Sequence, residues 1–285
     1  RMHRQQERDF MKGLKRMGLI TGAIIVALAA LIIVGLQIKP ASFPGYPSQT
    51  TPLETVSLPD DLPEPVQRFY RTMYGEEIPV IHSAVLTGTA RLRPMGFTMP
   101  GRFRFTHDAG QAYRHYIEAT LWGVPVMKVN ERYLDDVGRM ELPFATVEDQ
   151  PKTNAAANLG LWGESLWLTP IFVTDARVRW EPIDATHARL IVPFEDDAED
   201  EFTVTFDPET GLISRMEAMR WKEADSPEKT LWILDVLRWE TVDGRPLLVE
   251  SQVTWADDGK PWLVITVEDI VYDVDVSQYI RQRGL

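Results

Sequence analysis

Histidine side chains are the groups in this sequence best suited to binding a metal or moving a proton. The five histidines are scattered along the chain, at His3, His82, His107, His115 and His187. Only His107 and His115 could meet, because the turn signal at residues 108–110 predicts a hairpin between them. A zinc site needs a third ligand, and neither an HxH nor an HExxH spacing occurs. The pattern therefore favours surface or sheet histidines, and it predicts no metal and no cofactor.

Carboxylates gather in the acidic run at residues 195–201. Calcium binds six to eight oxygens, but the D-x-[DN]-x-[DN]-G pattern is absent, so a solvated hairpin loop is favoured. Residues 163–166 (GESL) lack the second glycine of a G-x-S-x-G serine motif, and no Gly-rich phosphate loop occurs. A carboxylate pair for glycoside hydrolysis is assembled in space. No catalytic residue is predicted, and a hydrolase with such a pair is the third functional hypothesis.

The tryptophans indicate more about function than the histidines or carboxylates do. The chain has nine tryptophans, nearly all on predicted strands or on a predicted central helix. In residues 231–239 both faces of the predicted strand are largely apolar, as expected where one face meets core helices and the other a cavity or partner. The alternative is an ordinary core with a few exposed aromatics. We predict that a hydrophobic ligand contacts Trp162, Trp167, Trp232, Trp239 and Trp255.

An uncharged segment near the N-terminus predicts a membrane anchor. Residues 17–38 carry no charge, and 22 residues of helix give roughly 33 Å, enough for a hydrocarbon core of about 30 Å. The competing interpretation is a cleaved signal peptide, whose apolar region is normally about 7 to 15 residues. The length favours a retained, single-pass signal anchor in contact with the lipid bilayer.

The flanking charges predict the orientation of this helix. Six basic residues precede it, and only Lys39 follows before Arg68. Since Lys and Arg resist translocation, residues 1–16 are expected in the cytoplasm and residues 62–285 outside the cytoplasmic (inner) membrane, in the periplasm. The basic segment has a net charge of +4; subtracting it and Lys39 from the whole-chain −12 leaves −17 for residues 40–285, which argues against nucleic acid as a partner.

The absence of cysteine narrows the chemistry further. It excludes disulfides, thiolate metal sites, Fe–S clusters and a lipid-modified N-terminal cysteine. The predicted helix is then the attachment to the membrane. Residues 39–61 contain five prolines, which disfavour regular pairing, and they are predicted to form a linker with a reach of some 70 Å or a strap on a partner.

The remaining chain, residues 62–285, predicts one strand-rich domain. A short amphipathic helix fits residues 62–75, with Pro63 and Pro65 near its start and Gly75 at its end. A second, at residues 154–168, is expected to cross or plug a curved sheet. Two-fold alternation with turn signals between segments predicts strands at 81–93, 97–106, 111–121, 124–134, 177–182, 187–194, 200–206, 212–221, 230–241, 246–256 and 261–273. The fold class is mainly β: a curved antiparallel meander, barrel or half-barrel, with one or two packed helices.

Several short segments resemble a bacterial family of membrane-associated proteins of unknown function. They are LPEPVQRFYR (62–71), Glu164-x-x-Trp167-x-x-Pro170, VRWEPID (178–184), FDPETGLISRMEAMR (206–220) and DVDVSQYIRQRG (273–284). The resemblance implies no assigned activity. More loosely, the order helix, strands, central helix, strands is similar to the periplasmic lipoprotein carriers, whose half-barrels hold acyl chains.

Two hypotheses lead. The first is a non-enzymatic, membrane-anchored domain whose curved sheet offers an apolar concavity to a lipid or other hydrophobic ligand. The second is a structural or accessory subunit of a membrane complex, with its helix packed against integral partner subunits and its linker strapped to a neighbour. A sheet interior filled by side chains would overturn the first hypothesis in this form.

Overall fold

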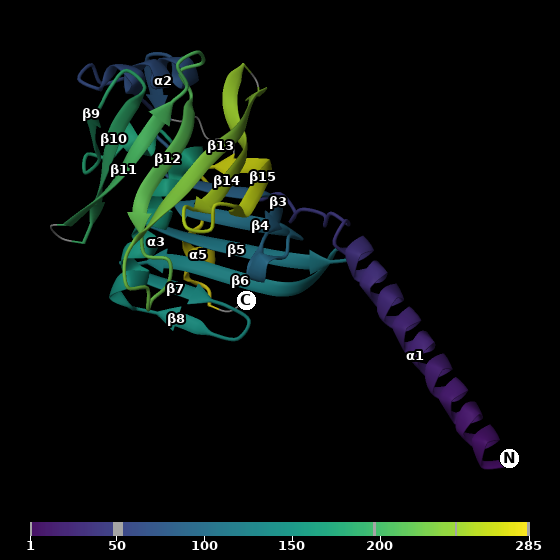
Figure 1. Ribbon diagram of the computed structural model, residues 1–285. Coiled ribbons are helices and arrows are strands. Elements are labelled where there is room, and N and C mark those ends of the chain that lie inside the picture. Colours follow the sequence, from purple (N-terminus) through teal and green to yellow (C-terminus); the bar gives the residue numbers. More distant parts are fainter. Residues whose placement is uncertain (1, 48–53, 196–197, 243, 284–285) are drawn as a thin grey trace.

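A curved antiparallel sheet that does not close forms the domain (Figure 1). The structure is a computed structural model and describes residues 2–47, 54–195, 198–242 and 244–283. The sheet contains β3 Ser83–Leu92, β4 Met99–Asp108, β5 Ala112–Leu121, β6 Val124–Leu134, β7 Val137–Glu141, β8 Thr146–Glu148, β9 Arg179–Pro182, β10 His187–Phe194, β11 Ala198–Phe206, β12 Ile213–Arg220, β13 Thr230–Val242, β14 Arg245–Trp255 and β15 Pro261–Tyr272. Their order is β8-β7-β6-β5-β4-β3-β15-β14-β13-β12-β11-β10-β9, which confirms the predicted meander as a half-barrel.

The chain builds this sheet outward from the middle and then returns inward. Strands β3 to β8 step by hairpins to one edge. The helices α3 (Pro151–Gly163), η2 (Glu164–Trp167) and α4 (Ile171–Thr174) then carry the chain to the opposite edge, where β9 begins. Strands β9 to β15 step back until β15 pairs with β3. Helix α3 contacts β6, β7, β10 and β12, strands from both halves, as expected for a helix that crosses the concave face.

Helix α3 and η2 fill most of the concave face. A Cβ atom on Gly163 would lie 2.7 Å from the ring of Trp232, so the missing side chain lets the end of α3 approach β13 closely. Trp162 and Trp232 are both fully buried in one continuous apolar core. The open concavity expected from the sequence is therefore largely occupied by side chains, which overturns the inside of the curved sheet as the ligand-binding surface.

Helix α2 (Glu64–Tyr74) covers one end of the half-barrel. Pro63 precedes its first turn, and Gly75 ends it with a positive φ of 77°, both as predicted. The helix buries Val66, Phe69 and Tyr70 against the core. A two-stranded pair, β1 (Thr55–Ser57) with β2 (Glu77–Pro79), flanks it and was not predicted, nor were β7, β8 and the C-terminal helix α5 (Ser277–Arg281).

Helix α1 (Met2–Gly35) projects from the domain (Figure 1). Its segment Lys15–Gly35, 21 residues long, is long and apolar enough to cross a membrane, and its residues are exposed except Gly35, which lies against the domain. The apolar side chains of this segment are thus available to lipid. The helix ends at Gly35, before the predicted boundary at residue 38.

Residues 39–47 form a strap that lies on the chain's own sheet. Lys39 Nζ lies 2.9 Å from Glu268 Oε1, the ring of Phe43 lies 4.3 Å from the Arg102 guanidinium carbon, and Tyr46 donates a hydrogen bond to the carbonyl of Asp275. The prolines keep this segment out of the sheet ladder, but its aromatic and charged side chains find partners there. These contacts hold the end of α1 beside the domain, whereas the sequence predicted a spacer or a strap on a neighbouring protein. The rest of that predicted linker up to residue 53 lies outside the described residues.

Candidate functional site

An apolar cavity of about 270 Å³ lies between α2, η2 and the paired strands β13 and β14. Two tryptophans from separate elements face it, Trp167 at the end of η2 and Trp239 near the end of β13. The rest of its wall is mostly aliphatic and aromatic, including Met73, Tyr74, Leu166, Leu248, Ile270 and Tyr272. The cavity is therefore built from parts of the chain that lie far apart in sequence.

The polar atoms of the aromatic side chains around this cavity are bonded within the protein. Trp167 Nε1 donates to the carbonyl of Leu248 at 3.0 Å, and Trp239 Nε1 donates to the carbonyl of Ile213 at 3.0 Å. The Tyr272 hydroxyl donates to the carbonyl of Trp167 at 2.9 Å. The tryptophan and tyrosine rings therefore present hydrocarbon to the cavity, the lining expected for a hydrophobic ligand.

One cation stands at the mouth of the cavity. Arg245 begins β14 opposite Val242, and both residues are exposed. Within the described part of the chain Arg245 forms no ion pair. Burial raises the pKa of the neighbouring Tyr74 hydroxyl, while its bond to Thr169 and the charge of Arg245 lower it. An apolar wall with a cation at its opening suits a ligand that carries both hydrocarbon and negative charge.

A second group of polar side chains lies on the concave face beneath α3. His107 on β4 and His115 on β5 approach to 3.2 Å between their Nε2 atoms, across the hairpin that the sequence predicted. On the other side of His115, Nδ1 lies 3.1 Å from Glu164 Oε2. His107 and His115 are almost completely buried, and His107 Nδ1 has no hydrogen-bond partner among the described residues. The three side chains form a continuous row inside the core.

Burial keeps this row uncharged. It raises the pKa of Glu164 to about 8, with the nearby Glu131 acting in the same direction. It lowers the pKa of His107 to about 3, and it lowers the pKa of His115 well below its usual value. At neutral pH the carboxyl is therefore largely protonated and both imidazoles are neutral. No cluster of three or more His, Cys, Asp or Glu residues suited to a metal occurs in the described ranges.

A neighbouring network carries the charges of this region. Tyr113 donates a 2.6 Å hydrogen bond to Glu131 Oε1, and Arg220 Nη2 lies 3.4 Å from the same oxygen. The Arg220 guanidinium also stacks over Trp232 at 4.4 Å and donates to the carbonyl of Ala156 in α3. These contacts tie β5, β6, β12 and α3 together, so the network positions the crossing helix on the sheet.

Residues 53–266 match the model of a family of unknown function, DUF6544. This match spans most of the chain. The chain belongs to this family. The resemblance predicted from the short motifs is thereby confirmed. A comparison with curated proteins gives no match.

Solved structures similar to this DUF6544 chain come from several bacteria. They include a LolA superfamily protein from Nitrosomonas europaea, with 9% identity, a TM-score of 0.46, and coverage of 77% of this chain and 96% of that one. A DUF1329 family protein from Desulfovibrio piger has 14% identity, a TM-score of 0.42 and coverage of 71% and 90%. A putative outer membrane lipoprotein-sorting protein domain from Vibrio parahaemolyticus has 10% identity, a TM-score of 0.41 and coverage of 70% and 89%.

The five tryptophans predicted for ligand binding separate into different environments in this DUF6544 chain. Trp167 and Trp239 line the apolar cavity. Trp162 is buried in α3 and borders a different, polar cavity of about 590 Å³ on the side of Arg177 and Glu199. Trp232 and Trp255 lie in the main core, where Arg220 stacks on both rings. The structure thus brings two of the five to one ligand-sized space.

A β-bulge explains why Trp239 reaches the cavity. Strict alternation from Trp232 places Trp239 on the opposite face of β13. The register of β13 against β14 shifts between Val236 and Trp239, so that Val236 pairs with Ser251 but Trp239 pairs with Leu248. The extra residue moves Trp239 to the concave side. Tyr74 and Arg245 were missed by sequence reasoning, since only the docking of α2 on β14 brings them to the same opening.

Proposed function

We propose that this chain is a membrane-anchored protein whose extracytoplasmic domain binds the hydrocarbon part of an anionic amphiphile in the cavity beside Trp167 and Trp239. The observation that carries the proposal is the enclosed apolar wall with Arg245 at its mouth. Helix α1 and the basic residues that precede its apolar segment support the anchor and its orientation. No catalytic step is part of the proposal.

The size of the cavity narrows the class of ligand. A volume of about 270 Å³ lies just below the roughly 300–1,000 Å³ of pockets that enclose whole drug-sized ligands. A single acyl chain, or the end of one, suits this space better than a ligand with several chains. The carboxylate or phosphate at the head of such a chain would then lie at Arg245 in water, where a charged hydrogen bond needs no burial.

The position of the cavity bears on how a ligand enters. Figure 1 shows α2 and the β13–β14 hairpin, whose residues Val242 and Arg245 form the mouth, at the end of the domain remote from α1. In the proposed topology the mouth therefore opens toward the aqueous compartment and away from the anchoring bilayer. This position would allow the domain to exchange its ligand with a soluble protein in that compartment.

Displacement of a fluorescent fatty acid from the full chain in lipid nanodiscs tests the proposal. Leu247→Trp fills the mouth from a partly exposed position and should weaken binding at least about tenfold. Arg245→Gln should weaken binding of the fatty acid about three- to fivefold but leave binding of the matching fatty alcohol unchanged, because only the acid carries the charge and the pair is exposed to water. The matched control is Arg71→Gln, which removes an exposed cation of α2 that pairs with Glu76.

Two results would contradict the proposal. Unchanged fatty-acid affinity in Leu247→Trp would show that the probe binds elsewhere. Equal losses for the acid and the alcohol in Arg245→Gln would show that the arginine does not contact the head group.

A further inference from the structure

Three turns at one end of the strands carry exposed apolar side chains, and the middle turn contacts α1. Alternate turns of an antiparallel meander lie at the same end of the strands, so the β3–β4, β5–β6 and β7–β8 turns lie side by side at one end. Phe97 in the first turn is 72% exposed, Trp122 in the second is 44% exposed, and Phe144 in the third is fully exposed. These three turns are called the rim below.

The turns at the opposite end of the same strands carry acidic rather than aromatic side chains. Asp108 ends β4 just before the β4–β5 turn, and Asp135 and Asp136 form the turn between β6 and β7. Exposed apolar residues scattered singly over a surface need no explanation. Here, however, large aromatic side chains lie in three turns at one end of the strands, whereas carboxylates lie at both turns of the other end. The β14–β15 turn, with Asp257 and Asp258, bounds the rim at the first end of the strands.

Trp122 occupies a position that a tryptophan rarely takes. It has a φ of 57° and is followed by Gly123 with a φ of 73°, the left-handed pair of a two-residue hairpin turn. Asn or Asp is the ordinary residue at the first of these positions, and a bulky side chain there costs backbone energy. The indole must therefore be held at this turn by something other than the turn's own conformation.

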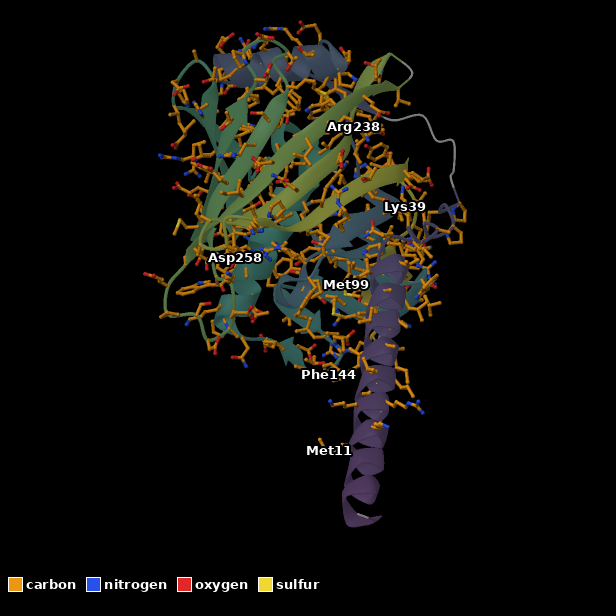
Figure 2. The ribbon with its side chains drawn as sticks, turned by 45° about the vertical axis from the view of Figure 1, so that its right-hand side comes forward. Met11, Lys39, Met99, Phe144, Arg238 and Asp258 are labelled. Atoms are coloured by element: carbon orange, nitrogen blue, oxygen red, sulfur yellow. The ribbon has the colours of Figure 1, made fainter. Side chains whose placement is uncertain are left out.

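The rim is attached directly to the end of the apolar helix. The Trp122 backbone N–H donates to the carbonyl of Gly35, the last residue of α1, at 3.1 Å. A Cβ atom on Gly35 would lie 2.4 Å from Trp122 Nε1, so the glycine admits the indole against the helix. Where α1 leaves the hydrocarbon core, Trp122 must then lie at the level of the lipid head groups, the depth at which tryptophan is enriched. Figure 2 shows Phe144 at the end of the domain from which α1 descends and Arg238 of β13 at the opposite end.

We propose that the rim is a membrane-contact surface, in which Phe97, Trp122 and Phe144 enter the interfacial layer of the bilayer that α1 spans. The proposal rests on the anchoring half of the proposed function and does not involve the cavity. The domain would lie on the outer leaflet in a fixed orientation. The strap of residues 39–47 and the contact of Trp122 with Gly35 would allow little movement of the helix relative to the sheet. The occupant is a lipid surface rather than a protein partner, because the rim continues from a helix whose exposed apolar segment is long enough to cross a membrane.

The absence of cysteine makes a direct test available. Single-cysteine variants of the full chain, each carrying one spin label, are reconstituted in nanodiscs of phosphatidylcholine and phosphatidylglycerol. Collision with oxygen, which concentrates in lipid, is compared with collision with a water-soluble nickel complex. Labels at Phe97→Cys and Phe144→Cys should favour oxygen about tenfold or more over a label at Ile183→Cys, which is 47% exposed after β9 at the far edge of the sheet.

A label at Leu28→Cys separates the two ways the test can fail. If the Leu28 label is lipid-exposed while the labels at positions 97 and 144 collide mainly with nickel, the anchor stands and the membrane-contact surface is overturned. If labels at 97 and 144 are shielded from both reagents, a protein covers the rim, which also overturns the proposal. If the Leu28 label itself is aqueous, the anchor fails together with the rim, whereas fatty-acid binding by the cavity is measured independently.

Discussion

Replacing Trp232 with alanine should lower the free energy of unfolding of the domain by about 3–5 kcal/mol. The side chain is fully buried on β13 at the point where Gly163 brings α3 and η2 onto the sheet. Its removal leaves a large cavity there and takes away the ring on which the Arg220 guanidinium stacks at 4.4 Å. Urea unfolding of the full chain in nanodiscs, followed by circular dichroism, measures the change.

Trp221→Ala is the matched control, because it deletes the same side chain from a partly exposed position between β12 and β13. Its expected cost to the unfolding free energy is below about 1 kcal/mol, the scale of a surface substitution. If the two variants were equally stable, Trp232 would not lie in a packed interior and α3 would not fill the concave face. Trp232→Phe keeps an aromatic ring and should recover part of the loss.

The strands were predictable because their signals are local. Alternation over six to thirteen residues and turns such as Asp108-Ala109-Gly110 are complete within each hairpin, and all eleven predicted strands occur with their ends shifted by no more than two residues. The strands β7 and β8, with five and three residues, are too short for a clear alternation and were missed. The central helix was predicted from residue 154, but Pro151 starts it earlier and Glu164 begins a tighter 3-10 turn.

The sites were less predictable because they depend on long-range register. The hairpin between β4 and β5 could be expected to bring His107 to His115. No local sequence pattern predicts that Glu164 of η2 lies next to His115. The same holds for Trp239, whose face is decided by one bulge, and for Arg245, whose neighbour Tyr74 is contributed by a helix that precedes the sheet. Sequence patterns report which residues are apolar; pairing decides which of them meet.

The buried row at Glu164 predicts an unusual dependence of stability on pH. Its pKa is raised from 4.5 to about 8 in the folded domain, so the folded state binds a proton that the unfolded state releases. This contribution is fully present below about pH 4.5 and is lost as the pH rises through 8. His107 acts in the opposite sense, because its pKa falls from 6.5 to about 3 and its contribution is lost as the pH falls below 6.5. These two groups together favour a stability maximum in the mildly acidic range.

Glu164→Gln isolates the alkaline limb of this profile. Glutamine imitates the protonated carboxyl at all pH values, so the stability of the variant relative to the parent should rise between pH 5.5 and pH 8.5 by on the order of 3 kcal/mol of unfolding free energy. Urea titrations of both proteins at the two pH values give the difference. Glu199→Gln serves as the control: this carboxylate is exposed and its pKa is lowered by Arg179, so it stays ionised across the whole window. Parallel pH profiles for Glu164→Gln and the parent would mean that Glu164 is ionised in the folded domain, and the row beneath α3 would then have to hold a charge that its surroundings do not balance.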